Sequence, residues 1–246
     1  MKNYAVIQHN YSEFLGQIER QLEIRDIGFS YFRPFVGQDL PGSAIHFDAL
    51  FILGGSSLVN DEQQTPWVES EKRVIRLFQA ARRPVVGIGF GAMLIAESLG
   101  AIMNKEPYHN AYWTIAHKTK AGEGDALAEA VDGKRVLVFA NGSATLPDNI
   151  EPIVIDDNGN WLAIRPDSMT YGMLFRPELK PGMIEDMIME ADRETPDNIG
   201  DLLAEARQEW ADTQKTTDAI IMALVKSLDL MKERHKAPVF KLNVES

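Results

Sequence analysis

The sequence contains no cysteine. This absence excludes disulfide bonds, metal sites built from thiolates and a cysteine nucleophile. Basic residues are also scarce, because 25 lysines and arginines stand against 36 aspartates and glutamates, which gives a formal net charge of -11. An acidic surface of this kind argues against non-specific binding to nucleic acids and to anionic membranes.

Long apolar runs are missing too. No uninterrupted run approaches the length that a membrane-spanning helix needs. The N-terminus lacks the basic start and apolar core of a secretory signal peptide. With 45% hydrophobic and 25% charged residues over 246 positions, the composition is typical of a globular protein. The sequence therefore predicts a cytoplasmic protein with neither a membrane nor a nucleic-acid partner.

The histidines show no spacing that is typical of metal ligands. They are His9, His46, His109, His117 and His235. We therefore expect structural roles for them, and we predict neither a metal site nor a cofactor.

The first hundred residues alternate between short apolar runs and amphipathic stretches. Strands are predicted at residues 4–8, 28–35, 47–53 and 84–88, and the intervening helices begin near Ser12 and Pro66. This alternation predicts a parallel, doubly wound sheet. Ligands bind such sheets beyond the carboxyl ends of the strands, where the loops after residues 53 and 88 fall.

Beyond residue 101 the pattern becomes partly antiparallel. Strands are predicted at residues 111–117, 135–139, 153–156, 161–165 and 170–175, tight turns at 141–143 and 157–160, and helices at 181–191, 199–210 and 216–232. We interpret residues 1–191 as one domain and residues 192–246 as a helical C-terminal extension packed on it. The apolar faces of the last two helices are interpreted as core or as a homo-oligomer interface.

Residues 84–100 have the pattern of strand, glycine turn and helix, which is the geometry of a nucleophile elbow. Glycines stand at the alternate positions Gly87, Gly89 and Gly91. The central residue, Gly89, has no side chain, so the pattern predicts an elbow without a nucleophile. Alternatively, the three glycines serve only the close packing of strand and helix.

Four segments, taken in order, resemble the class I glutamine amidotransferase family. They are residues 6–9, 47–55, 66–100 and 172–178, and the last resembles the motif Gly-x-Gln-Phe-His-Pro-Glu. The resemblance spans roughly residues 4–191. It implies an α/β, flavodoxin-like fold, with a mostly parallel doubly wound sheet and a helical C-terminal extension.

In that family a cysteine on the elbow attacks glutamine, a histidine takes its proton and a glutamate orients the histidine. The resemblance places Gly89, Arg176 and Glu178 at these three positions. A glycine cannot form a thioester, and arginine stays protonated in proteins. We therefore expect the chain not to hydrolyse glutamine.

The resemblance assigns five residues to the substrate pocket, and all of them except Gly54, which matches the family's Gly-Gly loop, depart from the family's pattern. They are Gly54, Met93, Asn141, Ser143 and Leu174. The backbone amides of Gly55 and Phe90 can still form an oxyanion-hole-like nest. Alternatively, Gly54 and Gly55 form only a tight turn at the end of a strand.

Arg176 and Glu178 have three interpretations. A guanidinium that points into the cleft, with backbone amides beside it, would favour a small anionic or amino-acid-like ligand. A closed ion pair would be structural. A solvated pair would be a surface contact that stabilises the protein by under ~1 kcal/mol.

Three functions are compatible with these observations. The resemblance implies a degenerate amidotransferase-like protein that acts as a binding or regulatory module, with a synthetase or other protein on a separate chain as its partner. The alternative is an active amidotransferase or hydrolase of the same fold with a different nucleophile, for which Ser56, Ser57 and Ser143 are the nearest hydroxyls. The third is a structural homo-oligomer built on the C-terminal helices.

Overall fold

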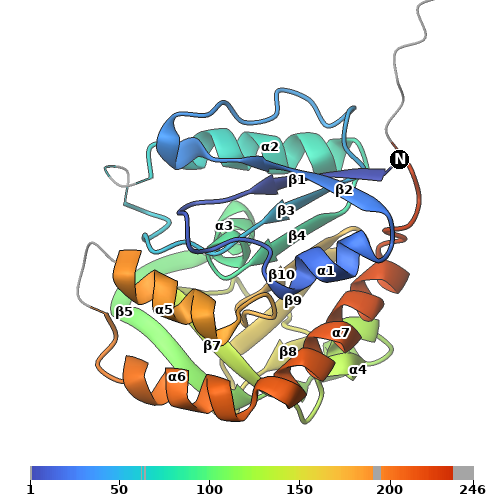
Figure 1. Ribbon diagram of the computed structural model, residues 1–246. Coiled ribbons are helices and arrows are strands. Elements are labelled where there is room, and N and C mark those ends of the chain that lie inside the picture. Colours follow the sequence, from blue (N-terminus) through green and yellow to red (C-terminus); the bar gives the residue numbers. More distant parts are fainter. Residues whose placement is uncertain (1, 62, 64, 191–194, 235–246) are drawn as a thin grey trace, which may run out of the picture.

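The structure, a computed structural model, describes residues 2–61, 63, 65–190 and 195–234 (Figure 1). Its main sheet contains β1 (Lys2–Ile7), β2 (Ile27–Phe32), β3 (Ala49–Ile52), β4 (Val85–Ile88), β6 (His117–Lys118), β8 (Val154–Ile155), β9 (Trp161–Asp167) and β10 (Thr170–Met173). The strand order is β2-β1-β3-β4-β10-β9-β8-β6. The strands β2, β1, β3, β4 and β10 pair in parallel. The strands β9, β8 and β6 continue the sheet with antiparallel pairing. The predicted doubly wound, mostly parallel sheet is confirmed.

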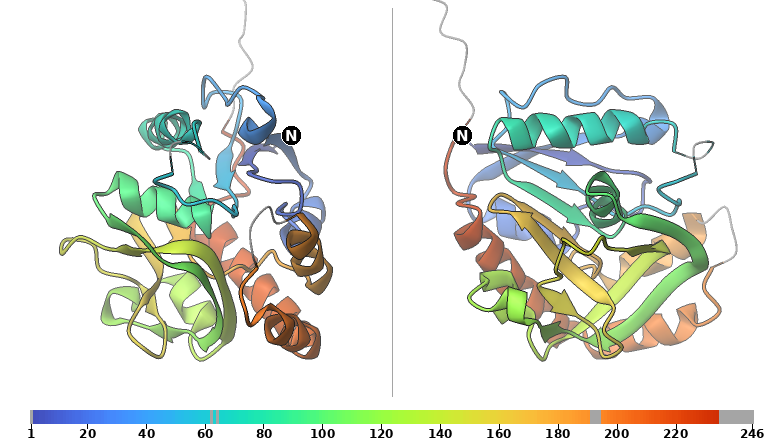
Figure 2. Two further views of the ribbon diagram at one scale, coloured as in Figure 1. Left: turned by 90° about the vertical axis from the view of Figure 1, so that its left-hand side faces the viewer. Right: turned by 180° about the vertical axis from the view of Figure 1, so that it is seen from behind.

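Helices cover both faces of this sheet. They are α1 (Gln17–Glu23), α2 (Val68–Ala80), α3 (Phe90–Ser98), α4 (Ala126–Val131), α5 (Pro181–Glu190), α6 (Ile199–Gln208) and α7 (Trp210–Ser227), with short 3-10 turns η1 (Pro34–Val36) and η2 (Lys120–Gly122). Figure 2 shows α2 and α3 on one face, and α1 and α7 on the other. The strands β3 and β4 are therefore buried on both faces, which explains their continuous apolar sequences.

A second, two-stranded antiparallel sheet is formed by β5 (Ile102–Ile115) and β7 (Arg135–Thr145). Helices α5 and α6 pack on it around a small core of their own. This core includes Leu137, Met183, Ile184 and Leu202. The described residues therefore form two apolar cores, one at the main sheet and one beneath α5 and α6.

The C-terminal helix α7 packs on α1 and α4. Its residues Ile220, Ile221 and Leu224 are fully buried in the main core. Of the two interpretations of this apolar face, the structure confirms the core. The division into residues 1–191 and 192–246 stays a prediction. Among the described helices, none is long and apolar enough to cross a membrane.

Two predicted turns have different outcomes. The turn at residues 157–160 is confirmed, because it joins the antiparallel strands β8 and β9. The turn at residues 141–143 is wrong. Asn141 and Ser143 lie inside β7 and pair with His109 and Asn104 of β5, where the register shifts. Gly142 has a φ of 73°, a conformation that favours glycine, and it lies where the pairing of β5 and β7 becomes irregular.

Helix boundaries also differ from the predictions. The first helix begins at Gln17 rather than near Ser12, because Gly16, with a φ of 52°, holds the position before it. The last helix begins at Trp210, directly after α6 and Glu209. Helix α4 was not predicted. Ala191, the predicted end of α5, and His235 lie outside the described residues.

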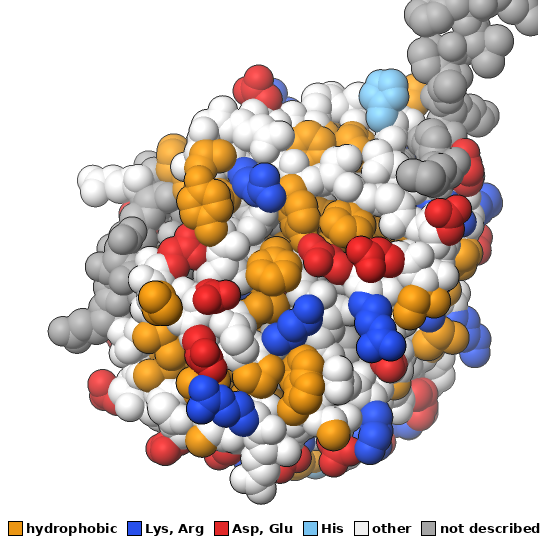
Figure 3. All heavy atoms as spheres, viewed as in Figure 1, with side chains coloured by type: hydrophobic (Ala, Val, Ile, Leu, Met, Phe, Trp, Pro, Cys, Tyr) orange, Lys and Arg blue, Asp and Glu red, His pale blue; other side chains and the backbone are white. Residues whose placement is uncertain are grey.

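The face shown in Figure 3 carries acidic and basic side chains in alternation, with apolar side chains between them. Charges of one sign do not gather into a large patch on this face. The face therefore offers no field of one sign that would by itself select a charged macromolecule.

Candidate functional site

Gly89 alone makes the turn between β4 and α3. Its φ of 55° and ψ of -111° are a conformation that glycine adopts easily and other residues rarely do. The amide of Gly89 donates a hydrogen bond of 2.8 Å to the carbonyl of Met173, which joins the turn to the end of β10. The elbow geometry that the sequence predicts is therefore present, and it carries no nucleophile.

Gly87 and Gly91 serve the packing of α3 against the strands. A Cβ on Gly91 would lie 2.3 Å from the carbonyl oxygen of Ile52, and one on Gly87 would lie 2.5 Å from the carbonyl oxygen of Gly91. Both separations are shorter than any real carbon contact. The packing interpretation is therefore confirmed for these two glycines.

Arg176 follows β10 and extends its side chain over the elbow. Its Nε donates to Glu178 Oε1 and its Nη2 donates to Glu13 Oε2, each at 2.5 Å, while Nη1 donates to the carbonyl of Phe139 at 3.0 Å. All three guanidinium nitrogens are therefore engaged. The arrangement that opens Arg176 toward a ligand is wrong, because both neighbouring carboxylates close around it.

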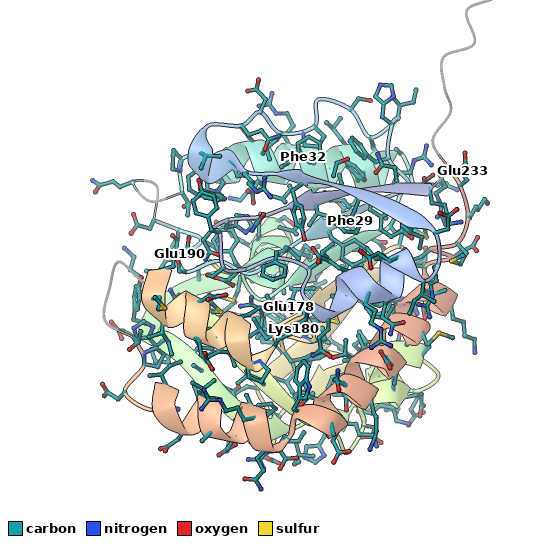
Figure 4. The ribbon with its side chains drawn as sticks, viewed as in Figure 1. Phe29, Phe32, Glu178, Lys180, Glu190 and Glu233 are labelled. Atoms are coloured by element: carbon teal, nitrogen blue, oxygen red, sulfur yellow. The ribbon has the colours of Figure 1, made fainter. Side chains whose placement is uncertain are left out.

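The solvated ion pair is wrong as well. The side chains of Arg176 and Glu178 are 1% and 0% exposed. Figure 4 shows Glu178 near the centre of the molecule, between α1 and the strands behind it. A buried pair of this kind is held by geometry and hydrogen bonds rather than weakened by water.

Two glycines make room for this arginine. A Cβ on Gly54 would lie 2.2 Å from Arg176 Nη2 and 2.3 Å from Glu13 Oε2, and one on Gly89 would lie 3.0 Å from Arg176 Cδ. The arginine therefore occupies the space that side chains at these positions would need. We call Glu13, Gly54, Gly89, Arg176 and Glu178 the arginine cluster.

Glu13 was not identified from the sequence. It lies in the loop between β1 and α1, and its side chain is 1% exposed. Asn10 holds both the side chain and the backbone of Glu13. Asn10 Nδ2 donates to Glu13 Oε1 at 2.5 Å, and Asn10 Oδ1 accepts from the Glu13 backbone amide at 2.8 Å. The only sequence signal is an acidic residue among apolar neighbours.

Burial and the neighbouring charges together shift the pKa values of Glu178 and Arg176. Burial raises the pKa of Glu178 by more than the adjacent guanidinium lowers it. Glu178 Oε2 has no hydrogen-bond partner within the described part of the chain. Burial alone would lower the pKa of Arg176, but Glu178 and Glu13 outweigh it and hold this pKa above the usual range. Arg176 therefore stays a cation and cannot accept a proton.

His9 forms a second buried charge pair beside the cluster. Its Nδ1 lies 2.8 Å from the carbonyl oxygen of Gly54, and its Nε2 lies 3.0 Å from Glu71 Oε1. Both partners are acceptors, so both ring nitrogens carry protons. Burial alone would lower the pKa of His9, but Glu71, the Gly54 carbonyl and Glu13 together raise it. His9 is therefore an imidazolium that is already paired.

The Gly54–Gly55 loop meets the elbow around His9. A Cβ on Gly55 would lie 3.1 Å from His9 Cβ and 3.4 Å from the ring of Phe90. The rings of His9 and Phe90 lie 4.5 Å apart. The structure thus brings Gly55 and Phe90 together, while the oxyanion-hole-like nest of their amides stays a prediction.

The remaining predicted pocket residues are buried in the core or bonded to backbone carbonyls. Met93 and Leu174 belong to the main core and are 3% and 5% exposed. Asn141 Nδ2 donates to the carbonyl of Ser56, and Ser143 Oγ donates to the carbonyl of Glu106 at 3.2 Å. Asn141 thereby fastens the loop after β3 to β7. The contacts of these four residues are thus structural in the described part of the chain.

A cavity of about 450 Å³ opens next to the arginine cluster. Its wall includes Glu13 but none of the predicted site residues of the elbow, the glycine loop, β7 or the segment after β10. Aromatic rings and polar groups line it, among them His9, Phe35, Trp67, Phe139 and Glu190. The sequence did not indicate this cavity, because its wall combines loops from the first half of the chain with α5 and the start of α6. Among the described residues, no group of three or more His, Asp or Glu could hold a metal ion.

Comparison with known proteins agrees with this geometry. The family described as glutamine amidotransferase class-I matches residues 3–192. The glutamine amidotransferase-like protein YfeJ of Salmonella typhimurium is 27% identical over 199 residues, which are 79% of this chain and 83% of that protein.

Solved structures share the fold at low sequence identity. A glutamine amidotransferase of Methylobacillus flagellatus has a TM-score of 0.78 at 19% identity and covers 97% of this chain and 98% of its own. One of Thermotoga maritima has a TM-score of 0.75 at 18% identity, with 92% and 98% covered. A GMP synthase-like protein of Thermoplasma acidophilum, titled as one subunit of that enzyme, has a TM-score of 0.55 at 15% identity, with 87% and 98% covered. These likenesses show the fold.

Proposed function

Because this chain belongs to the class I glutamine amidotransferase family, we propose that it is a member that does not hydrolyse glutamine and acts as a binding or regulatory module. One observation carries the proposal. The side chain of Arg176, bonded to Glu13 and Glu178, fills the space above Gly89 where a nucleophile would stand. The chain has no cysteine at this or any other position.

Two of the three groups of the family's triad are replaced in this chain, and the third, Glu178, is bonded to the guanidinium. Gly89 offers no atom that could attack an amide. Arg176 cannot take a proton from an attacking group, and the carboxylate that would orient a histidine is bonded to the guanidinium instead. The neighbouring imidazolium of His9 carries two protons and can accept no further one. This supports loss of glutaminase chemistry rather than a change of nucleophile within the same triad.

The alternative of a hydroxyl nucleophile has little support. Ser143 donates to a backbone carbonyl. Ser56 and Ser57 lie at the wall of the cavity, and within the described ranges neither bonds to an imidazole or a carboxylate. A serine without an adjacent base is a weak nucleophile. The described residues therefore offer no nucleophile–base pair to replace the lost one.

For the partner, we propose a synthetase or another protein. The likeness to a protein titled as one subunit of GMP synthase supports a synthetase, since the same fold occurs there within a larger enzyme. A homo-oligomer is compatible with either partner. It would not use the apolar face of α7, because Ile220, Ile221 and Leu224 are buried in this chain's own core.

The proposal is tested by ammonia release from glutamine. Purified protein is assayed beside an active member of the family at equal concentration. We expect no ammonia above the rate of the buffer alone, because neither nucleophile nor base is present. Turnover comparable to the active member would overturn the proposal and would favour the alternative nucleophile.

A further inference from the structure

The cavity beside the arginine cluster has the size of a small-molecule site. Its volume of about 450 Å³ falls within the range of roughly 300–1,000 Å³ that is typical of such sites. Four aromatic residues contribute to its wall, namely Phe35, Trp67, Tyr108 and Phe139. Aromatic side chains therefore form part of the wall.

The cations near this space are already occupied by other groups. His9 lines the cavity, but its two N–H groups point to the Gly54 carbonyl and to Glu71. Arg176 lies behind Glu13 with all three of its nitrogens engaged. His9 therefore has no N–H group left for an anionic ligand, and the Arg176 side chain is 1% exposed and does not line the cavity.

The carboxylates differ in this respect. Glu190, at the end of α5, accepts from the amides of Tyr11 and Ser12 at 2.8 and 2.7 Å, one at each oxygen. This fixes the carboxylate at the cavity wall, and each oxygen keeps a second acceptor position. Figure 4 shows Glu190 at the outer end of α5. With Glu13 also in the wall, two carboxylates face the space from the described residues.

We propose that this cavity binds an organic ammonium ion carried on a small apolar body. Aromatic faces attract a cation, and the fixed carboxylate of Glu190 supplies a charge-assisted acceptor for an N–H group. An anion of the same shape would meet these carboxylates, and the described residues of the wall offer it no lysine or arginine. The assignment rests on the proposed function, in that the site holds its ligand without hydrolysing it.

Three probes with the same phenylethyl body test the assignment by titration calorimetry. They are 2-phenylethylamine, 2-phenylethanol and 3-phenylpropionate, which differ at the end group. We expect the amine to bind at least about tenfold more tightly than the alcohol, and the carboxylate to bind most weakly. Equal or tighter binding of the carboxylate overturns the proposal. So does the absence of binding by all three probes at roughly 5 mM, which is weaker than the weakest specific sites.

Two variants on one helix locate the site. Glu190→Gln removes the charge at the cavity. Glu185→Gln removes an equal charge from the same helix, α5, at an exposed position where Glu185 pairs with Arg207 of α6. We expect Glu190→Gln to weaken amine binding about tenfold and to leave alcohol binding unchanged, because one charge-assisted contact is lost. Glu185→Gln should change neither. Equal effects of the two variants would mean that only net charge matters and would overturn the site.

A third variant tests the aromatic wall. Trp67→Leu keeps an apolar side chain and removes the ring, so we expect it to weaken the amine more than the alcohol. Equal loss for both probes would contradict the cation–ring contact. Failure of amine binding with no ammonia release from glutamine removes only the cavity assignment. Ammonia release removes the proposed function, whatever the amine does.

Discussion

The arginine cluster and the neighbouring cavity share one wall residue, Glu13, but they differ in every other respect. The cluster is filled by the side chain of Arg176, which is 1% exposed and has each nitrogen bonded. The cavity is hollow, about 450 Å³ in volume, and is lined by aromatic rings. The arginine cluster is thus part of the packed interior, while the space beside it is hollow.

Under the proposed function, the position of the reaction centre and the space for a ligand are separate in this chain, whereas an active enzyme combines them. On the same proposal, Gly89 supplies no nucleophile at the elbow, and its missing side chain also leaves room for the guanidinium. The replacement at Arg176 is then held by two carboxylates whose charges would otherwise be unpaired in the interior. We therefore expect substitutions in the arginine cluster to change stability, and substitutions in the cavity wall to change binding.

The largest effect is expected for Arg176→Met. The change leaves Glu13 and Glu178 buried without their cation, which should lower the free energy of unfolding by about 3–5 kcal/mol. Urea unfolding measures it. The matched control is Arg207→Met, which breaks the exposed pair with Glu185 and should cost under ~1 kcal/mol. Similar losses for both variants would show that the cluster is not a stabilising element.

A smaller effect is expected for Gly54→Ala. The added methyl group meets Arg176 Nη2 and Glu13 Oε2, so the guanidinium must move, at a cost of about 1–3 kcal/mol. Gly182→Ala is the control, because a Cβ there meets no atom within 4 Å. The cost of Gly54→Ala should fall when Arg176→Met is also present, which a double-mutant cycle measures. Additive losses would contradict the close fit of glycine and arginine.

The smallest effect concerns pH. The pKa of His9 is raised in the folded protein, so the folded state binds this proton more tightly than the unfolded chain does. Its contribution to stability is complete below the unfolded pKa of about 6.5 and is lost as pH rises through the higher folded pKa. The melting temperature should fall over this range in the wild type, and less in His9→Gln. Identical pH profiles for the two proteins would mean that His9 is not a paired imidazolium.

The sequence predicted those parts of the site that are local in the chain. Gly89 stands between an apolar run and a helical pattern, and Glu178 lies two residues after Arg176, so both could be assigned from neighbours in sequence. Glu13 could not, because its contact with Arg176 joins residues 163 positions apart. The sequence also could not show that the Arg176 guanidinium is bonded to both carboxylates, because this arrangement depends on the space left by Gly54.

The fold was predictable to a similar extent. The alternation of strands and helices indicated the main sheet, because buried parallel strands have continuous apolar sequences. The assignment of residues 141–143 failed, since asparagine and glycine favour both hairpin turns and irregularities inside strands. The cavity was not predictable, because its wall brings together residues as distant in sequence as His9 and Ile199.

The absence of cysteine allows the comparison of the two regions to be measured directly, since a single introduced thiol reports on its own surroundings. Gly89→Cys places the thiol against Arg176 in the arginine cluster, and Ser57→Cys places it at the cavity wall. Each variant is treated with a thiol reagent while folded and again in urea, with its melting curve as the check of folding. We predict that the folded Ser57→Cys protein reacts readily, whereas Gly89→Cys reacts at least about a hundredfold more slowly until it unfolds. Equally fast labelling of both folded variants would contradict the filled arginine cluster and, with it, the proposed loss of the reaction centre.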